Sequence, residues 1–451
     1  MQKNRYLARA GKIIALSRLS TALTSRTRGD VLLSILLASL VLAPDTTFAR
    51  NCEDTFVTQS AATQWLVESD AYRQWLSWER LANIPINKAI KERVELPTAE
   101  VSSTLVDVQA LGELSSSLKS FFSTQTVLWP RHPFNRASDK VPFNEIPATG
   151  SLNAGVTASR SLSLEQDPRQ RYTIKLATDT VQERNPGYEP GKLRTEYDIA
   201  AAIARADFIT KRDEKLGPPK GYVILHDVLT VADKKSGRGY IVRDISLLND
   251  GHYYLPAFAI PVLGREIAAH NLKDFDSFWQ QHYAEPLGRF KADFLLRYGL
   301  QMETPNAQNF LIQLDRNLHP TGLLVVRDIA DSVFVDVFAR GLGIDDVVIQ
   351  DFSRGRGVEF KIVPYWENSF QHFGKMLGYY DKDYETRLVP EVTLGNWAKA
   401  HNTAFASRMN RMLPDLSKSS QLRMEEQSNE ALEIYQRLRT EEGQAALKRL
   451  R

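Results

Sequence analysis

The sequence predicts an α/β (α+β) fold in which helices flank a mixed sheet, and three stretches carry this prediction. Residues 171–178 alternate between polar and apolar side chains, as a half-buried strand does. Residues 310–314 and 323–326 are short apolar runs on either side of a turn, which is typical of a β-hairpin. Apolar side chains recur every three or four positions between residues 275 and 297, which predicts a long helix with a kink or break at Pro286.

The composition indicates a globular chain with a sizeable core and more than one domain. Of its 451 residues, 43% are hydrophobic and 25% are charged. A net charge of +3 is too small on this length to indicate a nucleic-acid partner. Cys52 is the only cysteine, so the chain can form neither an intramolecular disulfide nor a thiolate metal site.

Residues 1–49 have the pattern of a secretory signal peptide or an N-terminal anchor. A basic segment precedes the apolar run at residues 31–43, and Thr47 and Ala49 place small residues at the two positions that a signal peptidase reads. The apolar run is short for a membrane span, although an uncleaved anchor is the alternative. The pattern predicts an exported protein, periplasmic or membrane-anchored, that meets the membrane only through this segment; without such a signal the protein is cytoplasmic.

The patterns beyond this segment predict four regions. Aromatic residues at helical spacing between residues 61 and 90 and helical periodicity over residues 105–122 predict a helical N-terminal region. A stretch rich in Ser, Gly, Ala and Pro at residues 144–167 predicts an internal linker or long loop. The predicted regions are a helical region at 50–125, a nucleotide-binding-like α/β region at 126–265, a C-terminal α/β region at 266–415 and a charged terminal helix at 416–451.

Polar side chains concentrate around the predicted hairpin. Asn306, Gln308 and Asn309 precede its first strand, and Arg327 and Asp328 follow its second strand. A guanidinium group matches phosphate oxygens, and carboxylate or amide oxygens suit a hard cation such as magnesium. The stretch therefore indicates a phosphate and metal site, and the alternative is a capping cluster with a surface ion pair.

Two other segments display cations or hydroxyl groups. A turn-rich basic loop at residues 129–140 contains His132 and Arg136 and either lines an anion site or is an ordinary solvated loop. The strand that carries Lys175 leads into a polar loop with Thr180 and Arg184, but the GxxxxGK[ST] pattern of a P-loop is missing.

A further pair, His226 and Asp227, lies in a hairpin pattern over residues 221–245. The histidine is interpreted as a satisfied core or surface residue, because a lone strand histidine is usually one.

The order of these features resembles that of the IucA/IucC-type siderophore synthetases, also called NRPS-independent siderophore synthetases. The likeness spans residues 129–380. The family loop reads approximately GHPxHPxxKxRxGF, and His132 and Arg136 fall on its second HP and its lysine position. Lys175 matches the KL of the strand before the family's phosphate loop, and the family's EAHGQN corresponds to residues 303–309, with one extra residue and Asn306 where the histidine belongs.

The resemblance implies a cupped-hand fold with an α/β palm, to which residues 266–415 contribute. Enzymes of this family use ATP and magnesium to adenylate a carboxylate, usually of citrate, before an amine or a hydroxyl attacks. The residues it implies are Asn306 and Arg327 as catalytic, Glu303, Gln308 and Asp328 near magnesium, and His132, Arg136, Lys175, Thr180, Arg184 and Asn309 near ATP.

The sequence therefore predicts an ATP-dependent ligase of siderophore biosynthesis and iron acquisition, with small carboxylate and amine substrates. Asn306 can donate a hydrogen bond but cannot transfer a proton as histidine can. Export would also separate the protein from ATP. The alternative is an exported, catalytically inactive relative that binds a polycarboxylate, a ferric siderophore or a partner protein. The oligomeric state is left open, a homo-oligomer included.

Overall fold

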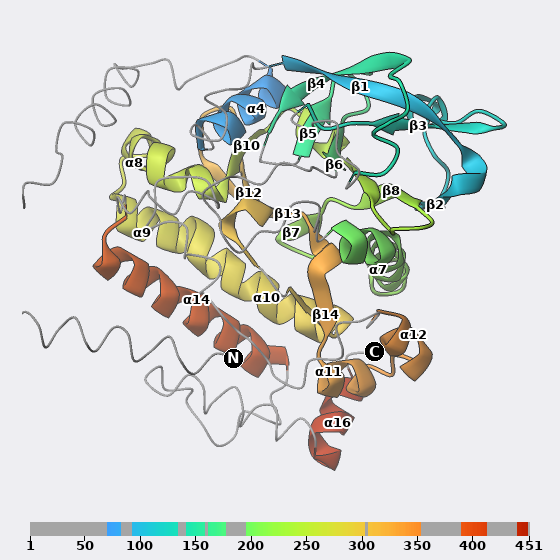
Figure 1. Cartoon of the computed structure of the whole chain (residues 1–451). Coiled ribbons are helices and arrows are strands. Elements are labelled where there is room, and N and C mark those ends of the chain that lie inside the picture. The colour runs from blue at the N-terminus through green and yellow to red at the C-terminus, as the bar shows by residue number, and fades with distance from the viewer. Residues whose placement is uncertain are drawn as a thin grey trace, which may run out of the picture. The chain divides into compact units, whose positions relative to one another are not determined.

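The computed structural model of the chain describes residues 70–82, 93–133, 141–157, 161–176, 195–302, 305–352, 389–412 and 440–449 (Figure 1). All of them belong to one compact unit, Val67–Arg451. The predicted signal segment at residues 1–49 lies outside the described residues. None of the described helices is long and apolar enough to cross a membrane.

The larger sheet has eight strands in the order β2-β8-β9-β6-β5-β4-β1-β3, and all neighbours are antiparallel. Alternation places Tyr240 and Val242 in the core on one face of this sheet, while Ile241 contacts the group of apolar residues around Ile199 of α7 on the other. The strands are β1 (Arg93–Ser102), β2 (Val106–Ala110), β3 (Thr126–Pro130), β4 (Gly150–Val156), β5 (Ser161–Leu164), β6 (Tyr172–Leu176), β8 (Asp227–Asp233) and β9 (Gly239–Asp244), and the helix α7 is Thr195–Leu216.

The smaller sheet has four strands in the order β10-β12-β13-β7 and is mixed, because β13 and β7 run parallel. The predicted hairpin is confirmed as β12 and β13, which pair antiparallel. Leu311 packs with residues of α4 on one face, and its neighbour Phe310 meets Phe290 of α10 on the other, with ring centroids 5.8 Å apart. The elements are β7 (Tyr222–Ile224), β10 (Tyr253–Pro256), β12 (Phe310–Leu314), β13 (Pro320–Val326), α4 (Ala71–Ala82) and α10 (Glu285–Tyr298).

The two sheets are joined where β7 ends and β8 begins. Only Leu225 and His226 separate these strands, so one chain segment passes from the smaller sheet into the larger. Residues 221–228, predicted as one strand of a hairpin, are therefore divided between two sheets, and the hairpin itself is β8–β9. This crossing brings the end of β13 close to β6 and β9.

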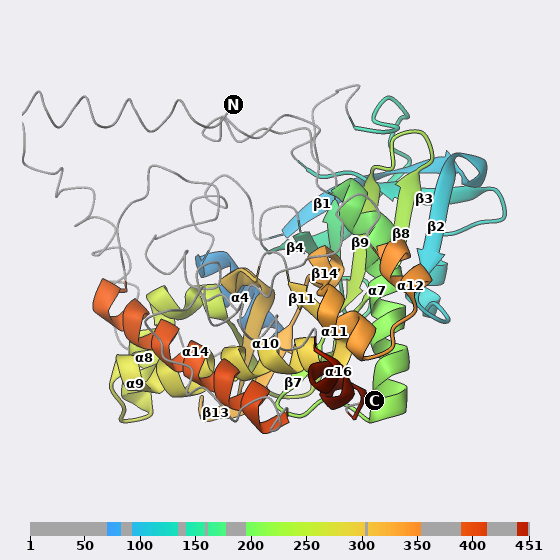
Figure 2. The same ribbon diagram turned by 90° about the horizontal axis from the view of Figure 1, so that it is seen from below.

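The predicted long helix over residues 275–297 is confirmed as α9 (Phe275–Trp279), a π-helical segment η4 (Gln280–Ala284) and α10. The irregular turn directly precedes Pro286, which has no N–H to donate, so the predicted break takes the form of a π-helical turn. Gly299 ends α10 in the left-handed conformation, with φ of 69°. α10 lies alongside α14 (Glu391–Met412), as both views show (Figures 1 and 2).

The remaining described elements are shorter and connect these layers. They are η1 (Ser103–Leu105), α6 (Ser116–Lys119), η2 (Ser246–Asn249), η3 (Ala257–Ala259), α8 (Ile260–His270), β11 (Leu300–Met302), η5 (Ala307–Asn309), η6 (Ile329–Asp331), β14 (Ser332–Phe334), α11 (Asp336–Gly341), α12 (Asp346–Phe352) and α16 (Glu441–Lys448).

Two predictions about the first half of the chain are wrong. Residues 105–122 were expected to be helical, but they contain strand β2 and only the single helical turn α6. The whole region 50–125 was also expected to be helical, but strand β1 lies in it as well. Residues 144–167 were expected to be a linker, yet they contain β4 and β5. Pairing on both sides and burial of Ala154 and Leu162 outweigh the weak strand propensity of the Ser and Gly residues there.

We expect Gly288→Ala to destabilise the protein by separating α10 from α14. A Cβ at Gly288 would lie 2.1 Å from the carbonyl oxygen of His401, so a backbone must move. Overpacking of this kind costs roughly 1–3 kcal/mol. The matched control is Gly395→Ala on α14, where a Cβ meets no atom within 4 Å and the better helix propensity stabilises by about 0.5–1 kcal/mol. Thermal and urea unfolding of both variants measures the difference; equal effects of the two changes would refute the close approach.

Candidate anion and metal site

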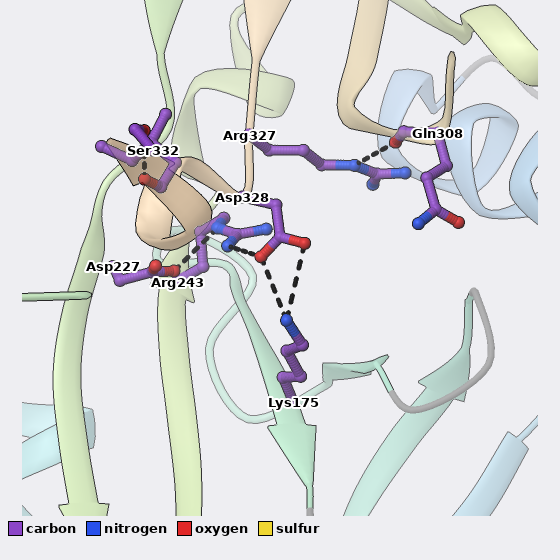
Figure 3. A network of polar contacts seen from close by, with 8 residues as sticks. Lys175, Asp227, Arg243, Gln308, Arg327, Asp328 and Ser332 are labelled. Atoms are coloured by element: carbon purple, nitrogen blue, oxygen red, sulfur yellow. Dashed lines mark hydrogen bonds and ion pairs between the residues drawn. The ribbon is translucent and has the colours of Figure 1, made fainter. Parts of the chain in front are cut away.

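The turn after β13 determines where Asp328 points. Asp328 has φ of 64° and ψ of 46°, the left-handed conformation that aspartate tolerates better than most residues, and it immediately precedes the 3-10 turn η6. Its carboxylate reaches toward the larger sheet, while the preceding Arg327 extends in another direction, toward Gln308 (Figure 3). The left-handed turn therefore separates two neighbouring charged residues into two different environments.

Two cations from adjacent strands of the larger sheet meet the Asp328 carboxylate. Lys175 of β6 places Nζ 3.2 Å from Oδ1 and 3.5 Å from Oδ2 (Figure 3). Arg243 of β9 places Nη2 3.1 Å from the same Oδ1. One carboxylate of the smaller sheet is thus held by two cations of the larger sheet.

Arg243 is itself fixed from its other side. Its Nε donates to Oδ1 of Asp227 at 2.8 Å, across the β8–β9 pair in which the two residues face each other. The Asp227 side chain is 1% exposed, and its Oδ2 accepts no hydrogen bond from the described residues. Lys175, Asp227, Arg243 and Asp328 together form what we call the four-charge cluster.

Burial and attraction act in opposite directions on the carboxyls of this cluster. Burial disfavours ionisation of Asp328, but the attraction of Lys175 and Arg243 is larger in sum and lowers its pKa below the ordinary value. For Asp227, burial is the dominant effect, and it raises the pKa although Arg243 opposes it. Burial also disfavours the charge on Arg243, but its two carboxylate partners raise the pKa, so the guanidinium stays protonated. Asp328 is consequently the fully ionised carboxylate of the cluster.

Arg327 is held in a second ion pair, with a fully buried glutamate. Its Nη2 lies 2.6 Å from Oε1 of Glu79 on α4, and its Nε donates to the carbonyl oxygen of Gln308 at 2.8 Å. The Glu79 side chain is 0% exposed, and Trp75 Nε1 also donates to it, at 3.2 Å. These contacts give Arg327 a structural function, namely fastening α4 to the end of β13, and its catalytic function stays a prediction.

The amide residues before β12 form a compact turn next to Arg327. The Asn309 N–H donates to the Asn306 carbonyl at 2.8 Å, and the Asn309 carbonyl accepts from the Arg327 N–H at 2.9 Å. Asn306 and Asn309 are buried residues, with 3% exposure each. The structure thus brings Asn306, Gln308 and Asn309 beside Arg327, as the sequence order predicts.

The other predicted residues are distributed as follows. His132 is buried just beyond β3. Arg136, Thr180, Arg184 and Glu303 lie outside the described residues, so their assignments stay predictions. His226 makes no hydrogen bond or ion pair with its neighbour Asp227 among the described contacts, and burial lowers its pKa. This agrees with its interpretation as a core residue.

Sequence reasoning missed Arg243 and Asp227 as members of the cluster. A signal was present, because Arg243 directly follows the apolar residues 240–242 in strand β9, and a cation buried at such a position needs a partner. The partner lies on the paired strand β8, sixteen positions away, and only the strand register reveals it.

The residues present suit a phosphate or carboxylate group better than an isolated metal ion. Lys175 and Arg243 are cations directed at an oxyanion, while within the described part of the chain no three His, Cys, Asp or Glu side chains gather as a metal site would require. The ionised Asp328 is a suitable ligand for a hard cation. A magnesium ion bound there would have to share this carboxylate with Lys175 and Arg243.

Comparison with known proteins finds a remote likeness to solved structures. No protein-family model and no curated protein sequence matches the chain. Among solved structures, the ATP-bound aerobactin synthetase IucA of Klebsiella pneumoniae is 16% identical, with a TM-score of 0.44 over 71% of this chain and 65% of that one. Aerobactin synthetase IucC of the same species is 14% identical, with a TM-score of 0.46 over 72% and 64%.

The petrobactin biosynthesis protein AsbB of Bacillus anthracis is 13% identical, with a TM-score of 0.43 over 74% of this chain and 64% of that one. The chain thus spans less than two thirds of the length of each of these three proteins. The three solved structures are siderophore-biosynthesis proteins, and the chain is 13–16% identical to them with TM-scores of 0.43–0.46.

Proposed function

We propose that the chain is an ATP-dependent ligase of the siderophore-synthetase type, which adenylates a (poly)carboxylate such as citrate and condenses it with an amine or an alcohol. The observation that carries the proposal is the meeting of Lys175 and Arg243 at the Asp328 carboxylate, next to the Asn306–Asn309 turn. The motif order of the sequence, which includes Lys175 and Asp328, supports the proposal that this cluster belongs to an ATP pocket.

In this proposal, the cations of the cluster act on the triphosphate. Negative charge develops on the α-phosphate when a substrate carboxylate attacks it, and a fixed ammonium group such as Lys175 stabilises that charge. Lys175 is only 14% exposed, so its charge is screened less than that of a surface lysine. Asn309 and the predicted Arg136, Thr180 and Arg184 would bind further phosphate oxygens.

Magnesium is assigned to Glu303, Gln308 and Asp328 in this proposal. When bound, the ion would neutralise part of the triphosphate charge and orient it. Asp328 would hold the ion through its ionised carboxylate. Asn306 would donate a hydrogen bond from its amide, because it has no proton to transfer.

Asn306 is also the observation that favours a second candidate function. If proton transfer at this position is essential, the chain is an inactive relative that binds a polycarboxylate, a ferric siderophore or a partner protein. Such a protein needs no ATP, and this suits the export predicted from residues 1–49.

Calorimetric titration of the purified chain with ATP and magnesium separates the two candidates. The ligase predicts measurable heat and a rise in Tm at millimolar nucleotide, and carboxylate-dependent release of pyrophosphate when citrate is added. Neither heat nor a Tm shift with ATP, together with binding of citrate, would support the binding protein instead. In the ligase, Asp328→Asn should abolish the magnesium-dependent part of ATP binding, and unchanged affinity would remove Asp328 from the metal site.

A further inference from the structure

Strand β2 forms one edge of the larger sheet and pairs with β8 alone among the described residues (Figure 2). Backbone hydrogen bonds at both of its ends show which of its groups face β8. The Leu111 N–H donates to the Val228 carbonyl at 3.0 Å. The Lys234 N–H donates to the Leu105 carbonyl, also at 3.0 Å. Since backbone groups alternate in direction along an antiparallel strand, the odd-numbered residues of β2 face β8.

The even-numbered residues of β2 therefore turn their backbone groups away from the sheet. These residues are Val106, Val108 and Ala110, and no backbone hydrogen bond within the described part of the chain satisfies their N–H and C=O groups on that side. Val108 is also 42% exposed, although Val231, which faces it on β8, is buried. Strand β2 thus presents unpaired donors and acceptors beside an exposed apolar side chain, and such an edge can pair with a further strand.

The chain covers the opposite edge of the same sheet. Along β3, the Leu128 N–H donates to the Phe121 carbonyl at 2.8 Å, and the Ser123 N–H donates to the Thr126 carbonyl at 2.9 Å. Strand β2 has no such cover among the described residues, and it contains neither proline nor lysine, which commonly protect an edge strand. Of the two edges, the one at β2 is therefore the one suited to pairing.

The sequence of β2 is complementary to itself in an antiparallel pair centred on Val108. In this register Val108 faces Val108 of a second copy, Val106 faces Ala110, and Asp107 faces Gln109. The Asp107 carboxylate can then accept a hydrogen bond from the Gln109 amide. A register centred on Asp107 would instead place two carboxylates opposite each other, which is destabilising. Charge thus favours the register that also aligns the whole strand.

We propose that two copies of the chain associate through β2, so that their larger sheets join edge to edge in an antiparallel pair centred on Val108. The same surface is used on both copies, as a twofold dimer requires. Val106, Val108 and Ala110 each donate one backbone hydrogen bond to the other copy and accept one, and the two Val108 side chains cover each other. One short strand on each side is a small interface, so the dimer should dissociate on dilution.

Sedimentation equilibrium of the full-length chain tests the association. The wild type should form dimers reversibly between roughly 1 and 100 μM, the range expected of a small interface. Val108→Lys places two ammonium groups opposite each other and should weaken dimerisation at least about tenfold. The matched control is Val347→Lys on α12, where the valine is 64% exposed, and it should dimerise as the wild type does. A wild type that stays monomeric, or a Val108→Lys variant that dimerises equally well, would overturn the proposal.

Proline substitution tests which backbone groups face outward. Val108→Pro removes an N–H that β8 does not use, so it should weaken the dimer and leave the Tm of the monomer close to that of the wild type. Gln109→Pro removes an N–H that pairs with β8 and should lower the Tm clearly. Equal losses of Tm in the two variants would refute the outward direction of the Val108 N–H.

Oxidative cross-linking identifies the occupant of the edge. Directly opposite residues of an antiparallel pair have Cα atoms about 5.5 Å apart when they share hydrogen bonds, a distance that a disulfide can span. In a Cys52→Ser background, Val108→Cys should therefore form a covalent dimer, and Val347→Cys should not. A dimer without this cross-link, or equal cross-linking of both variants, would contradict pairing through β2. These measurements need no nucleotide, so their outcome is independent of the proposed ligase function.

Discussion

Arg327→Gln is expected to lower the free energy of unfolding by roughly 3–5 kcal/mol, because it leaves the buried Glu79 carboxylate without its cation. The two groups are 2.6 Å apart, and the Glu79 side chain is 0% exposed. Burial raises the pKa of Glu79, and Arg327 opposes this. Without the arginine, Glu79 must either take up a proton or remain as a buried charge that has lost this cation. Urea unfolding at pH 7 measures the loss.

The double variant Glu79→Gln with Arg327→Gln is the control for this prediction. It removes both charges, so it should be more stable than Arg327→Gln alone. A double variant that is as unstable as the single one would show that the ion pair is not the source of the loss. If Arg327→Gln keeps its stability but loses activity, the predicted catalytic function of Arg327 gains support over the structural one.

Asp328→Asn is expected to lower the free energy of unfolding by about 2 kcal/mol at pH 7, the loss of charge-assisted hydrogen bonds to Lys175 and Arg243. The difference in free energy of unfolding between the wild type and Asp328→Asn should depend on pH. The pKa of Asp328 is lower in the folded chain than its value of about 3.9 in an unfolded chain. The stabilisation is therefore fully present above pH 3.9 and is lost as the pH falls through the folded-state pKa.

Unfolding of the wild type and Asp328→Asn between pH 7 and pH 3 measures this dependence. The difference in their free energies of unfolding should be constant in the upper part of this pH range and should shrink below about pH 4. Asp207→Asn, which removes a carboxylate from the exposed pair with Lys211, should change the stability little at any pH. A difference for Asp328→Asn that grows as the pH falls would contradict the ionised Asp328 described here.

Periodicity predicted the elements whose apolar pattern is strong. The hairpin β12–β13, the strand β6 and the helices α9 and α10 carry their own signal, because each buries one face or one run of apolar side chains. Strands β4 and β5 were missed, since their Ser and Gly residues have little strand propensity and only pairing with neighbouring strands forms them. The predicted helical periodicity over residues 105–122 failed for the same reason at β2, which is fixed by pairing with β8.

The candidate site was predictable in part. Lys175 and Asp328 were both identified from the motif order, although 153 positions separate them, and the structure places them in contact. Arg243 and Asp227 were not identified as members of the cluster, because their contacts depend on the β8–β9 register and on the end of β13 lying beside β9. Arg327 was assigned to catalysis from the family resemblance. Its ion pair with Glu79 was not predicted, because Glu79 lies on a helix far away in the sequence and no local pattern indicates that pair.

Titration of the wild type, Lys175→Gln and Lys211→Gln with ATP and magnesium tests directly whether the four-charge cluster binds the phosphates of ATP. Lys211 is the matched control, since it is an exposed lysine, with 70% of its side chain accessible. We expect the wild type and Lys211→Gln to bind with equal affinity and Lys175→Gln to bind at least about tenfold more weakly. No binding to the wild type, or equal binding to wild type and Lys175→Gln, would contradict it.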